Sequence, residues 1–343
     1  MKEQKAVRVG VIGAGRIGKI HAEDLATRIN GAEVSCIADP LVDAAQETAI
    51  ALHIEKVTAD YQDILNDPEI DAVAICSPTA LHAQHIIEAA QAHKHIFCEK
   101  PIAYDLQKID LALAAVEEAG VKLQIGFNRR FDANFHQAHE MVTSGKIGQP
   151  HLLRITSRDP HPPSIEFVKQ SGGIFFDMTI HDFDMAQFMF GDIEEVYAVG
   201  NVLVDARIGE EGDIDTAIIL LKFRNGALGT IDNSRQAVYG YDQRLEAFGS
   251  EGMVQVQNIP TDSVIHSRAG EIAASKPMPF FLERYRDSFI REMAEFIECI
   301  RKDSPPPITG YDARKPVVIG LAAQESFRTG RPIKLSEIES GVR

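Results

Sequence analysis

The chain has 343 residues, of which 45% are hydrophobic and 25% charged, and its formal net charge is −15. These proportions are ordinary for a globular protein, and the length suggests two domains with a sizeable core. The acidic balance, without any basic run, argues against nucleic acid as a partner because phosphates would be repelled.

The cysteines and the apolar runs predict a cytoplasmic protein. The four cysteines include no C-x-x-C pair, and three of them lie in apolar runs typical of buried strands. This placement favours reduced thiols over disulfides or a thiolate zinc site. The apolar run 7–12 is too short for a signal peptide. No apolar stretch approaches the ~20 residues of a membrane span, so no membrane association is expected.

Residues 1–127 are predicted to form a doubly wound α/β domain of the Rossmann type. Short apolar runs that predict strands alternate here with longer segments of helical period. The strands are expected at 6–12, 33–39, 71–77, 95–99 and 122–127, and the clearest helices at 80–93 and 105–120. Alternating strands and helices, with nearly continuous apolar strands, predict a parallel sheet covered on both faces.

A G-x-G-x-x-G motif follows the first predicted strand. Gly13 would permit a tight turn, Gly15 would let the backbone approach a pyrophosphate, and Gly18 would let the helix pack closely on the strand. Asp39 ends the second predicted strand, where a carboxylate accepts hydrogen bonds from ribose hydroxyls and repels a 2′-phosphate. The pattern predicts NAD rather than NADP, and it makes a merely connecting glycine turn the weaker interpretation.

Lys100 follows the predicted strand 95–99 and precedes Pro101. Ligands bind at the carboxyl ends of parallel strands, so this position favours an active-site lysine. A solvated surface lysine is the alternative that the position alone leaves open.

Residues 128–310 are predicted to form an α+β domain with a large, open, mostly antiparallel sheet. Asn225-Gly226 inside 216–234 is a strong hairpin signal, and 244–256 indicates a second hairpin. Further strands are expected at 150–159 and 194–205. We expect this domain to bind substrate and to mediate oligomerisation. The segment 304–310 then breaks the chain before a helix at about 311–329, which could pack back on the first domain.

The stretch "GGIFFDMTIHDFDM", residues 172–185, places Asp177, His181 and Asp184 on one face of a predicted helix. A carboxylate and an imidazole so placed suit acid–base chemistry. Chelation of a metal and a solvated helix face are the alternatives, and no matching His/Cys cluster supports a metal. We expect no metal, and we expect Asp184, with Asp182, to be structural.

The motifs "GAGRIG", "CEKP", "GFNRRF" and "GGIFFDMTIHDFDM" together resemble the Gfo/Idh/MocA oxidoreductase family along essentially the whole chain. "SRDP" and "YGYDQR" make the resemblance closest to bacterial inositol 2-dehydrogenases. The resemblance implies a homotetramer that uses NAD to oxidise a cyclic polyol, foremost myo-inositol to 2-keto-myo-inositol (scyllo-inosose).

The resemblance also implies site residues. Its catalytic residues match Lys100, Asp177 and the acid/base residue His181. The expected polyol contacts are Lys100, Asn128, Arg129, Ser157, Asp159, Asp177, His181 and Tyr241. The expected NAD contacts are Gly13, Gly15, Arg16, Ile17, Gly18, Asp39, Ser77, Thr79, His82, Glu99 and Lys100. Asn128, Ser157 and Asp159 depart from what some inositol dehydrogenases have there, which leaves the particular polyol open.

The residue chemistry fits these roles by itself. Oxidising a secondary alcohol requires a base for the hydroxyl proton while the hydride leaves carbon, and an imidazole with an ordinary pKa near ~6.5 is such a base. Lys100 could stabilise negative charge on the reacting oxygen, and Asp177 could orient His181 or bind a neighbouring hydroxyl.

Other functions stay open from sequence. The substrate could be scyllo-inositol, D-chiro-inositol or an aldose. The chain could also be a glycosidase that uses NAD transiently, or a non-catalytic regulator that binds NAD. Net NADH production from a free polyol would distinguish a dehydrogenase from both.

Overall fold

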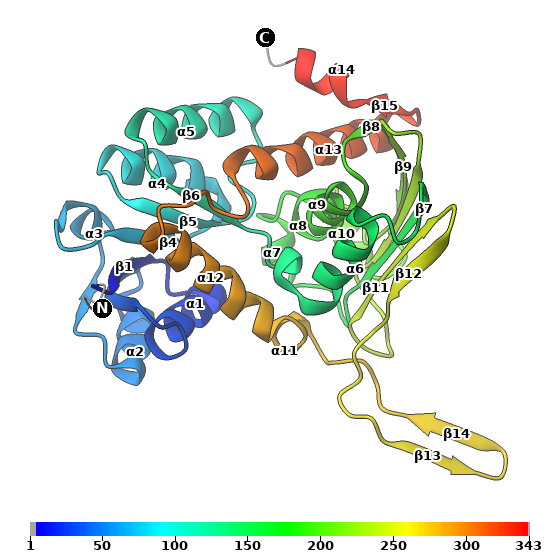
Figure 1. Cartoon of the computed structure of the whole chain (residues 1–343), viewed down its shortest axis with the longest axis horizontal. Helices are drawn as coiled ribbons and strands as arrows, with labels where there is room; N and C mark the ends of the chain where they lie inside the picture. Colours follow the sequence, from blue (N-terminus) through cyan, green and yellow to red (C-terminus); the bar gives the residue numbers. More distant parts are fainter. Residues whose placement is uncertain (1–4, 342–343) are drawn as a thin grey trace. The chain divides into compact units, whose positions relative to one another are not determined.

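The computed structural model describes residues 5–341. They form two compact units, each built on its own sheet (Figure 1). The first unit comprises the chain up to Phe131 together with Asp287–Lys315, and the second comprises Asp132–Arg286 and the chain from Pro316 onward.

The first unit contains a six-stranded sheet in the order β3-β2-β1-β4-β5-β6, and all its strands pair in parallel. The strands are β1 (Val7–Ile12), β2 (Ala32–Ala38), β3 (Lys56–Thr58), β4 (Ala72–Ile75), β5 (His95–Glu99) and β6 (Leu123–Gly126). The prediction of a doubly wound parallel sheet is confirmed. The strand order reverses between β1 and β4, and the carboxyl ends of strands at such a point form the usual ligand crevice.

The helices of the first unit cover this sheet. They are α1 (Arg16–Thr27), α2 (Val42–Leu52), α3 (Gln62–Asn66), α4 (Thr79–Gln91), α5 (Leu106–Ala119) and α12 (Arg286–Arg301), and η1 (Asn128–Phe131) follows β6. Helix α5 ends before Gly120, whose φ of 64° is the left-handed cap that the sequence predicts. Helix α12 comes from far along the chain, and its Phe296 and Ile297 complete the core around Val9 and Val11.

The second unit contains a seven-stranded sheet in the order β12-β11-β7-β10-β9-β8-β15. Its strands are β7 (Pro150–Arg158), β8 (Ile193–Asn201), β9 (Thr216–Phe223), β10 (Leu228–Ser234), β11 (Asp242–Gly249), β12 (Gly252–Val256) and β15 (Ile333–Lys334). Only β7 and β10 pair in parallel, so the predicted mostly antiparallel sheet is confirmed. Both predicted hairpins are present, and Gly226 has the positive φ, 91°, of its turn.

The two faces of this sheet differ. One face is covered by helices such as α9 (Thr179–Phe190), which contacts β7 and β10. The other carries exposed apolar side chains in register: Leu228 of β10 pairs with Leu152 of β7, which pairs with Phe248 of β11, which pairs with Met253 of β12. Leu220 and Ile218 of β9 are exposed on the same face, opposite Thr230 and Asp232 of β10, and Val199 of β8 pairs with Ile218.

The remaining elements connect or extend the second unit. The helices are α6 (Ala133–Thr143), α7 (Ile165–Val168), α8 (Ile174–Asp177), α10 (Ala206–Glu210), α11 (Phe281–Arg284), α13 (Gly310–Thr329) and α14 (Leu335–Ser340). A separate hairpin of β13 (Ile265–Arg268) and β14 (Glu271–Ala274) projects away from the seven-stranded sheet with every strand residue exposed (Figure 1). The first turn of α13 belongs to the first unit, where Tyr311 and Arg314 bond Glu117 and Asp110 of α5.

The expectation of one continuous helix over the 172–185 stretch is wrong. The helix is interrupted at Met178 between α8 and α9, where the Thr179 hydroxyl donates to the Ile174 carbonyl and to the Asn233 side chain. Asp177 therefore ends one short helix and His181 lies in the first turn of the next. Asp184 is 1% exposed, so it is packed inside rather than on a solvated face.

Two further findings concern the cysteines and the lengths of the apolar helices. All four cysteines are buried free thiols, so no disulfide is formed, as predicted. Among the described residues, no helix is long and apolar enough to cross a membrane.

Candidate active site

The glycine motif forms an open cradle at the start of α1. Gly13 has a φ of 104°, and a Cβ on it would lie 2.7 Å from the Cys76 carbonyl. A Cβ on Gly18 would overlap the Gly13 carbonyl oxygen, whereas one on Gly15 would meet nothing within 4 Å. Each glycine thus has the environment that its predicted role requires. No side chain caps α1, and its exposed first residue is Arg16, so backbone N–H groups face the space in which a pyrophosphate would bind.

Asp39 lies against this cradle. Its Oδ2 accepts a hydrogen bond from the Ala14 N–H at 2.7 Å, and its Oδ1 accepts one from the Leu41 N–H at 2.8 Å. The carboxylate is therefore fixed beside the glycine turn, where it suits the adenosine ribose of NAD. Donor set and geometry both fit a dinucleotide.

His82 joins the ends of β4 and β5. Its Nδ1 lies 2.8 Å from the Pro101 carbonyl oxygen and its Nε2 lies 2.7 Å from the Ser77 carbonyl oxygen. Burial lowers the pKa of His82, while the two carbonyl acceptors favour the protonated ring. This ring holds the segment that carries Ser77 and Thr79 next to the segment that carries Lys100. Its predicted contact with NAD stays a prediction.

His85 provides a pH-dependent contact in the same region. Its Nδ1 lies 3.0 Å from the Ser77 hydroxyl, and burial lowers the pKa of His85 to about 4. An unfolded histidine titrates near ~6.5, so the unfolded state takes up a proton first as the pH falls. We expect the free energy of unfolding to decrease between about pH 6.5 and pH 4. Denaturant titrations should show that the free energy of unfolding decreases less in His85→Gln than in wild type over this pH range. In the exposed control His266→Gln it should decrease as much as in wild type. An equal decrease in His85→Gln and wild type would contradict this assignment.

Glu99 ends β5, and Lys100 directly follows it. His21 Nε2 lies 2.7 Å from Glu99 Oε1, and the ligand atoms of His21, Glu99 and Glu292 lie within 4.8 Å of one another. This group has the donor set of a cation site, but His21 and Glu99 are already bonded to each other. The prediction that the chain needs no metal stays a prediction. Asn128 and Arg129 follow β6 in η1, and both are buried.

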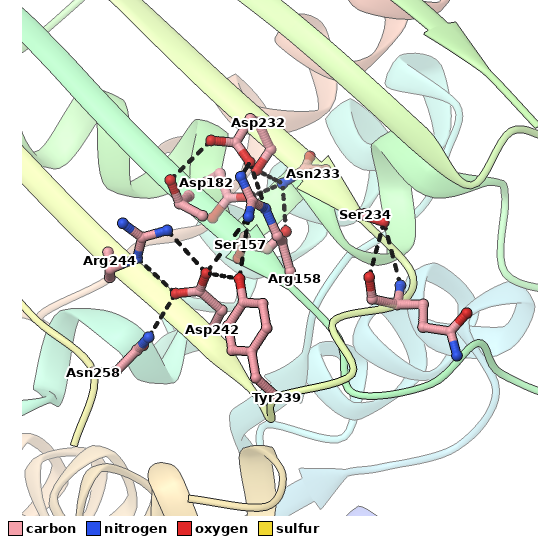
Figure 2. Close-up of polar contacts among 12 residues, drawn as sticks. Ser157, Arg158, Asp182, Asp232, Asn233, Ser234, Tyr239, Asp242, Arg244 and Asn258 are labelled. Carbon is pink, nitrogen blue, oxygen red and sulfur yellow. Dashed lines mark hydrogen bonds and ion pairs between the residues drawn. The ribbon is translucent and has the colours of Figure 1, made fainter. Parts of the chain in front are cut away.

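The second unit fixes Asp177 and His181 from the sheet below them. Asp177 Oδ2 accepts a hydrogen bond from Arg235 Nη1 at 2.9 Å. Asn233 of β10 accepts from the Thr179 hydroxyl at 2.6 Å and donates to Asp182 Oδ2 at 2.8 Å. Figure 2 shows Asn233 bonded to Asp182 and to the Ser157 carbonyl. His181 thus lies between two residues anchored to β10.

The other predicted substrate residues gather at the ends of β7 and β11. Ser157 is buried, and its hydroxyl donates to Gln243 Oε1 at 2.7 Å. The Asp159 N–H donates to the Ser234 carbonyl. The buried Tyr241 ring packs edge-on against Tyr285, with 6.1 Å between the ring centroids. The Ser157 hydroxyl is thus bonded to a neighbouring strand of the sheet. Contact of any of these residues with substrate remains a prediction.

Asp242 organises the adjoining loop. It is 1% exposed in its side chain and accepts hydrogen bonds from Tyr239, Arg244 and Asn258 (Figure 2). Burial works to raise the pKa of Asp242, but these donors outweigh it and lower the pKa below its ordinary value. The network fixes the backbone next to Tyr241.

Each unit therefore collects its own part of the predicted site. The first unit brings together the glycine cradle, Asp39, Ser77, His82 and Lys100. The second brings together Asp177, His181, Ser157, Asp159 and Tyr241 around β7, β10 and β11.

Sequence reasoning missed Asn233 and Arg235, which hold the second group. The signal that could have found them is the alternation that runs through β10 into the residue after it, where Ile231, Asn233 and Arg235 are all buried. An inward amide and an inward arginine at a strand end require polar partners.

Two family models match the chain. Residues 7–127 match an oxidoreductase family with an NAD-binding Rossmann fold, and residues 135–255 match a GFO/IDH/MocA C-terminal domain. The chain belongs to the Gfo/Idh/MocA oxidoreductase family. This membership confirms the sequence prediction of an NAD-dependent oxidoreductase.

Relatives of this Gfo/Idh/MocA protein are similar over nearly its whole length. Myo-inositol 2-dehydrogenase from Thermotoga maritima is 47% identical and covers 97% of this chain and 99% of that relative. Scyllo-inositol 2-dehydrogenase (NAD(+)) from Bacillus subtilis is 39% identical and covers 96% of each chain. The solved structure of scyllo-inositol dehydrogenase from Lactobacillus casei, with NAD(H) and scyllo-inositol bound, is 32% identical with a TM-score of 0.90, and the match covers 97% of this chain and 100% of that one.

Proposed function

We propose that this enzyme oxidises myo-inositol to 2-keto-myo-inositol with NAD as the oxidant. The observation that carries the proposal is the full-length likeness to two inositol dehydrogenases, of which the myo-inositol enzyme is the more similar at 47% identity. In this proposal NAD binds in the open cradle at Gly15 and against Asp39, whose carboxylate is fixed by the Ala14 N–H.

The proposed mechanism assigns one task to each catalytic residue. The glycine cradle and Asp39 would hold NAD, which would supply the acceptor for the hydride that leaves the alcohol carbon. The His181 imidazole takes the hydroxyl proton, so that the alcohol becomes a ketone. The Lys100 ammonium stabilises the negative charge that develops on the reacting oxygen. Asp177 orients the imidazole or binds a neighbouring hydroxyl. The remaining predicted contacts, Asn128, Arg129, Ser157, Asp159 and Tyr241, belong to polyol recognition in this proposal.

An NADH-absorbance screen tests the proposal. The panel comprises myo-, scyllo- and D-chiro-inositol, hexoses and glycosides. We expect the highest kcat/KM with myo-inositol, one NADH for each polyol oxidised, and no release of an aglycone. A higher kcat/KM with another isomer would change the substrate and keep the class, whereas no NADH from any polyol would reject the dehydrogenase.

We also propose that the enzyme is a homotetramer whose copies meet through the second unit. The outer face of its sheet presents exposed apolar residues on six neighbouring strands, including Leu152, Leu220 and Phe248. Contiguous apolar surface of this kind is typical of protein interfaces. The exposed hairpin β13–β14 adds Ile265 and Ile272, which are 65% and 77% exposed. Sedimentation velocity should give four times the chain mass, and a monomer at micromolar concentration would contradict this assembly.

We further propose a cytoplasmic location, because the buried free thiols fit a reducing compartment.

A further inference from the structure

Arg235 is a buried charge that no sequence motif marks. It directly follows β10, and its side chain is 0% exposed. Its Nη1 donates to Asp177 Oδ2 at 2.9 Å, and its Nη2 donates to Asp213 Oδ2 at 3.4 Å. The guanidinium thus lies between the predicted catalytic carboxylate and a second carboxylate for which the reaction has no obvious use.

Asp213 connects this guanidinium to the start of α8. Its Oδ1 accepts a hydrogen bond from the Ile174 N–H at 3.0 Å, and the Asp177 N–H donates to the Gly173 carbonyl at 3.0 Å. The contacts therefore run from the first turn of α8 through Asp213 and Arg235 back to Asp177, where α8 ends. Both ends of the helix are tied to the same arginine.

Gly173 makes the close approach of Asp213 possible. Its φ is 86°, and a Cβ on it would lie 2.9 Å from Asp213 Oδ1. A side chain at this position would be strained and would displace the carboxylate that holds Arg235. Gly173, the second of the two glycines before the 174–185 stretch, thus serves the Arg235 contact.

The backbone and the charge of Arg235 are also fixed. Its N–H donates to the Asp215 carbonyl at 2.8 Å, and the Asp215 carboxylate accepts from the N–H groups of Leu203 and Val204. Burial works to lower the pKa of Arg235, but the carboxylates of Asp177 and Asp213 outweigh it and raise the pKa. A guanidinium so held stays charged and has little freedom to move.

We propose that Arg235, held by Asp213, is a positioning residue that fixes the carboxylate plane of Asp177 for the oxidation. The inference rests on the proposed function, in which Asp177 assists His181. With Oδ2 bound to Arg235, the direction of Asp177 Oδ1 is set, and a misplaced catalytic group can lower a rate by ~10²-fold. In this proposal Arg235 acts on the reaction through Asp177.

A double-mutant cycle on the full-length enzyme tests this role. Arg235→Met should lower kcat by ~10-fold to ~10²-fold, with KM for myo-inositol and Kd for NAD within a few-fold of wild type. The same substitution in an Asp177→Asn background should lower kcat by less than about threefold further, because the residue through which it acts is already impaired. Arg235→Lys, which keeps the charge, should regain part of kcat.

Arg284→Met is the matched control. Arg284 is also a buried arginine of the second unit and is paired with Asp132. Its effect on kcat should multiply with that of Asp177→Asn, because the two pairs share no residue. Thermal unfolding checks that each variant is folded, and Asp213→Asn, which keeps an acceptor for Ile174, should give a loss in kcat of the same kind if Arg235→Met does not fold.

Two outcomes overturn the inference and are distinguishable. If wild type is active and the losses of Arg235→Met and Asp177→Asn multiply in full, Arg235 does not act through Asp177 and the proposed function stands. If wild type makes no NADH from any polyol, the proposed function fails and the positioning role fails with it.

Discussion

Replacing His181 or Lys100 with alanine is expected to lower kcat for myo-inositol oxidation by ~10²-fold or more, since general acid–base catalysis contributes effects of that size. The affinity for NAD should stay within a few-fold of wild type, because the glycine cradle and Asp39, which make up most of the expected NAD site, are unchanged in both variants. Stopped-flow or steady-state NADH absorbance gives kcat, and isothermal titration calorimetry gives the Kd for NAD.

Exposed residues of the same types serve as controls for these variants. His136→Ala on α6 and Lys108→Ala on α5 remove exposed side chains and should keep the wild-type kcat. Asp177→Asn should lower kcat less than His181→Ala if its role is to orient the imidazole. Turnover like that of wild type in His181→Ala or Lys100→Ala would remove that residue from the mechanism.

The second large effect concerns the choice of cofactor. We expect the kcat/KM of wild type to be at least ~10-fold higher with NAD than with NADP. The reason is that the Asp39 carboxylate accepts hydrogen bonds from the ribose hydroxyls and repels a 2′-phosphate. Asp39→Asn should reduce this preference, since it removes the charge but can still accept the Ala14 N–H. Asp39→Arg should favour NADP, because a guanidinium pairs with the 2′-phosphate.

These two variants separate charge from geometry at position 39. If Asp39→Asn keeps the full preference for NAD, the shape of the turn rather than the carboxylate charge excludes NADP. Equal kcat/KM values for NAD and NADP in wild type would refute the role of Asp39 altogether. Gly15→Val is the matched control. Its side chain fills the open cradle and should weaken the binding of NAD and of NADP equally.

The sequence predicts most of the first unit because its strands are short, apolar and separated by helices. The exception is β3, whose three residues are exposed or half-buried and therefore leave no apolar run. The contribution of α12 to this unit could not be read locally, since Phe296 and Ile297 show an apolar face but not the sheet against which it packs. Long-range pairing of this kind is a property of the folded chain.

The site shows the same limit. Glycine spacing and strand ends predict the cradle, Asp39 and Lys100, because each follows from local geometry. Helical periodicity over 172–185 predicts a common face but overlooks the break at Met178, which depends on Asn233 from a distant strand. Arg235 escapes for the same reason, since its partners Asp177 and Asp213 are separated from it by 58 and 22 residues.

The buried thiols allow the opening of the first unit to be followed by thiol labelling. Cys36, Cys76, Cys98 and Cys299 all belong to that unit, and burial raises the pKa of each, to about 11 for Cys36 and Cys299. Since the thiolate is the reactive form, the native protein should react slowly with thiol reagents, and labelling should follow transient opening of this unit alone. NAD binding would slow that labelling in proportion to its occupancy, so a single thiol assay could report cofactor affinity in variants that no longer turn over.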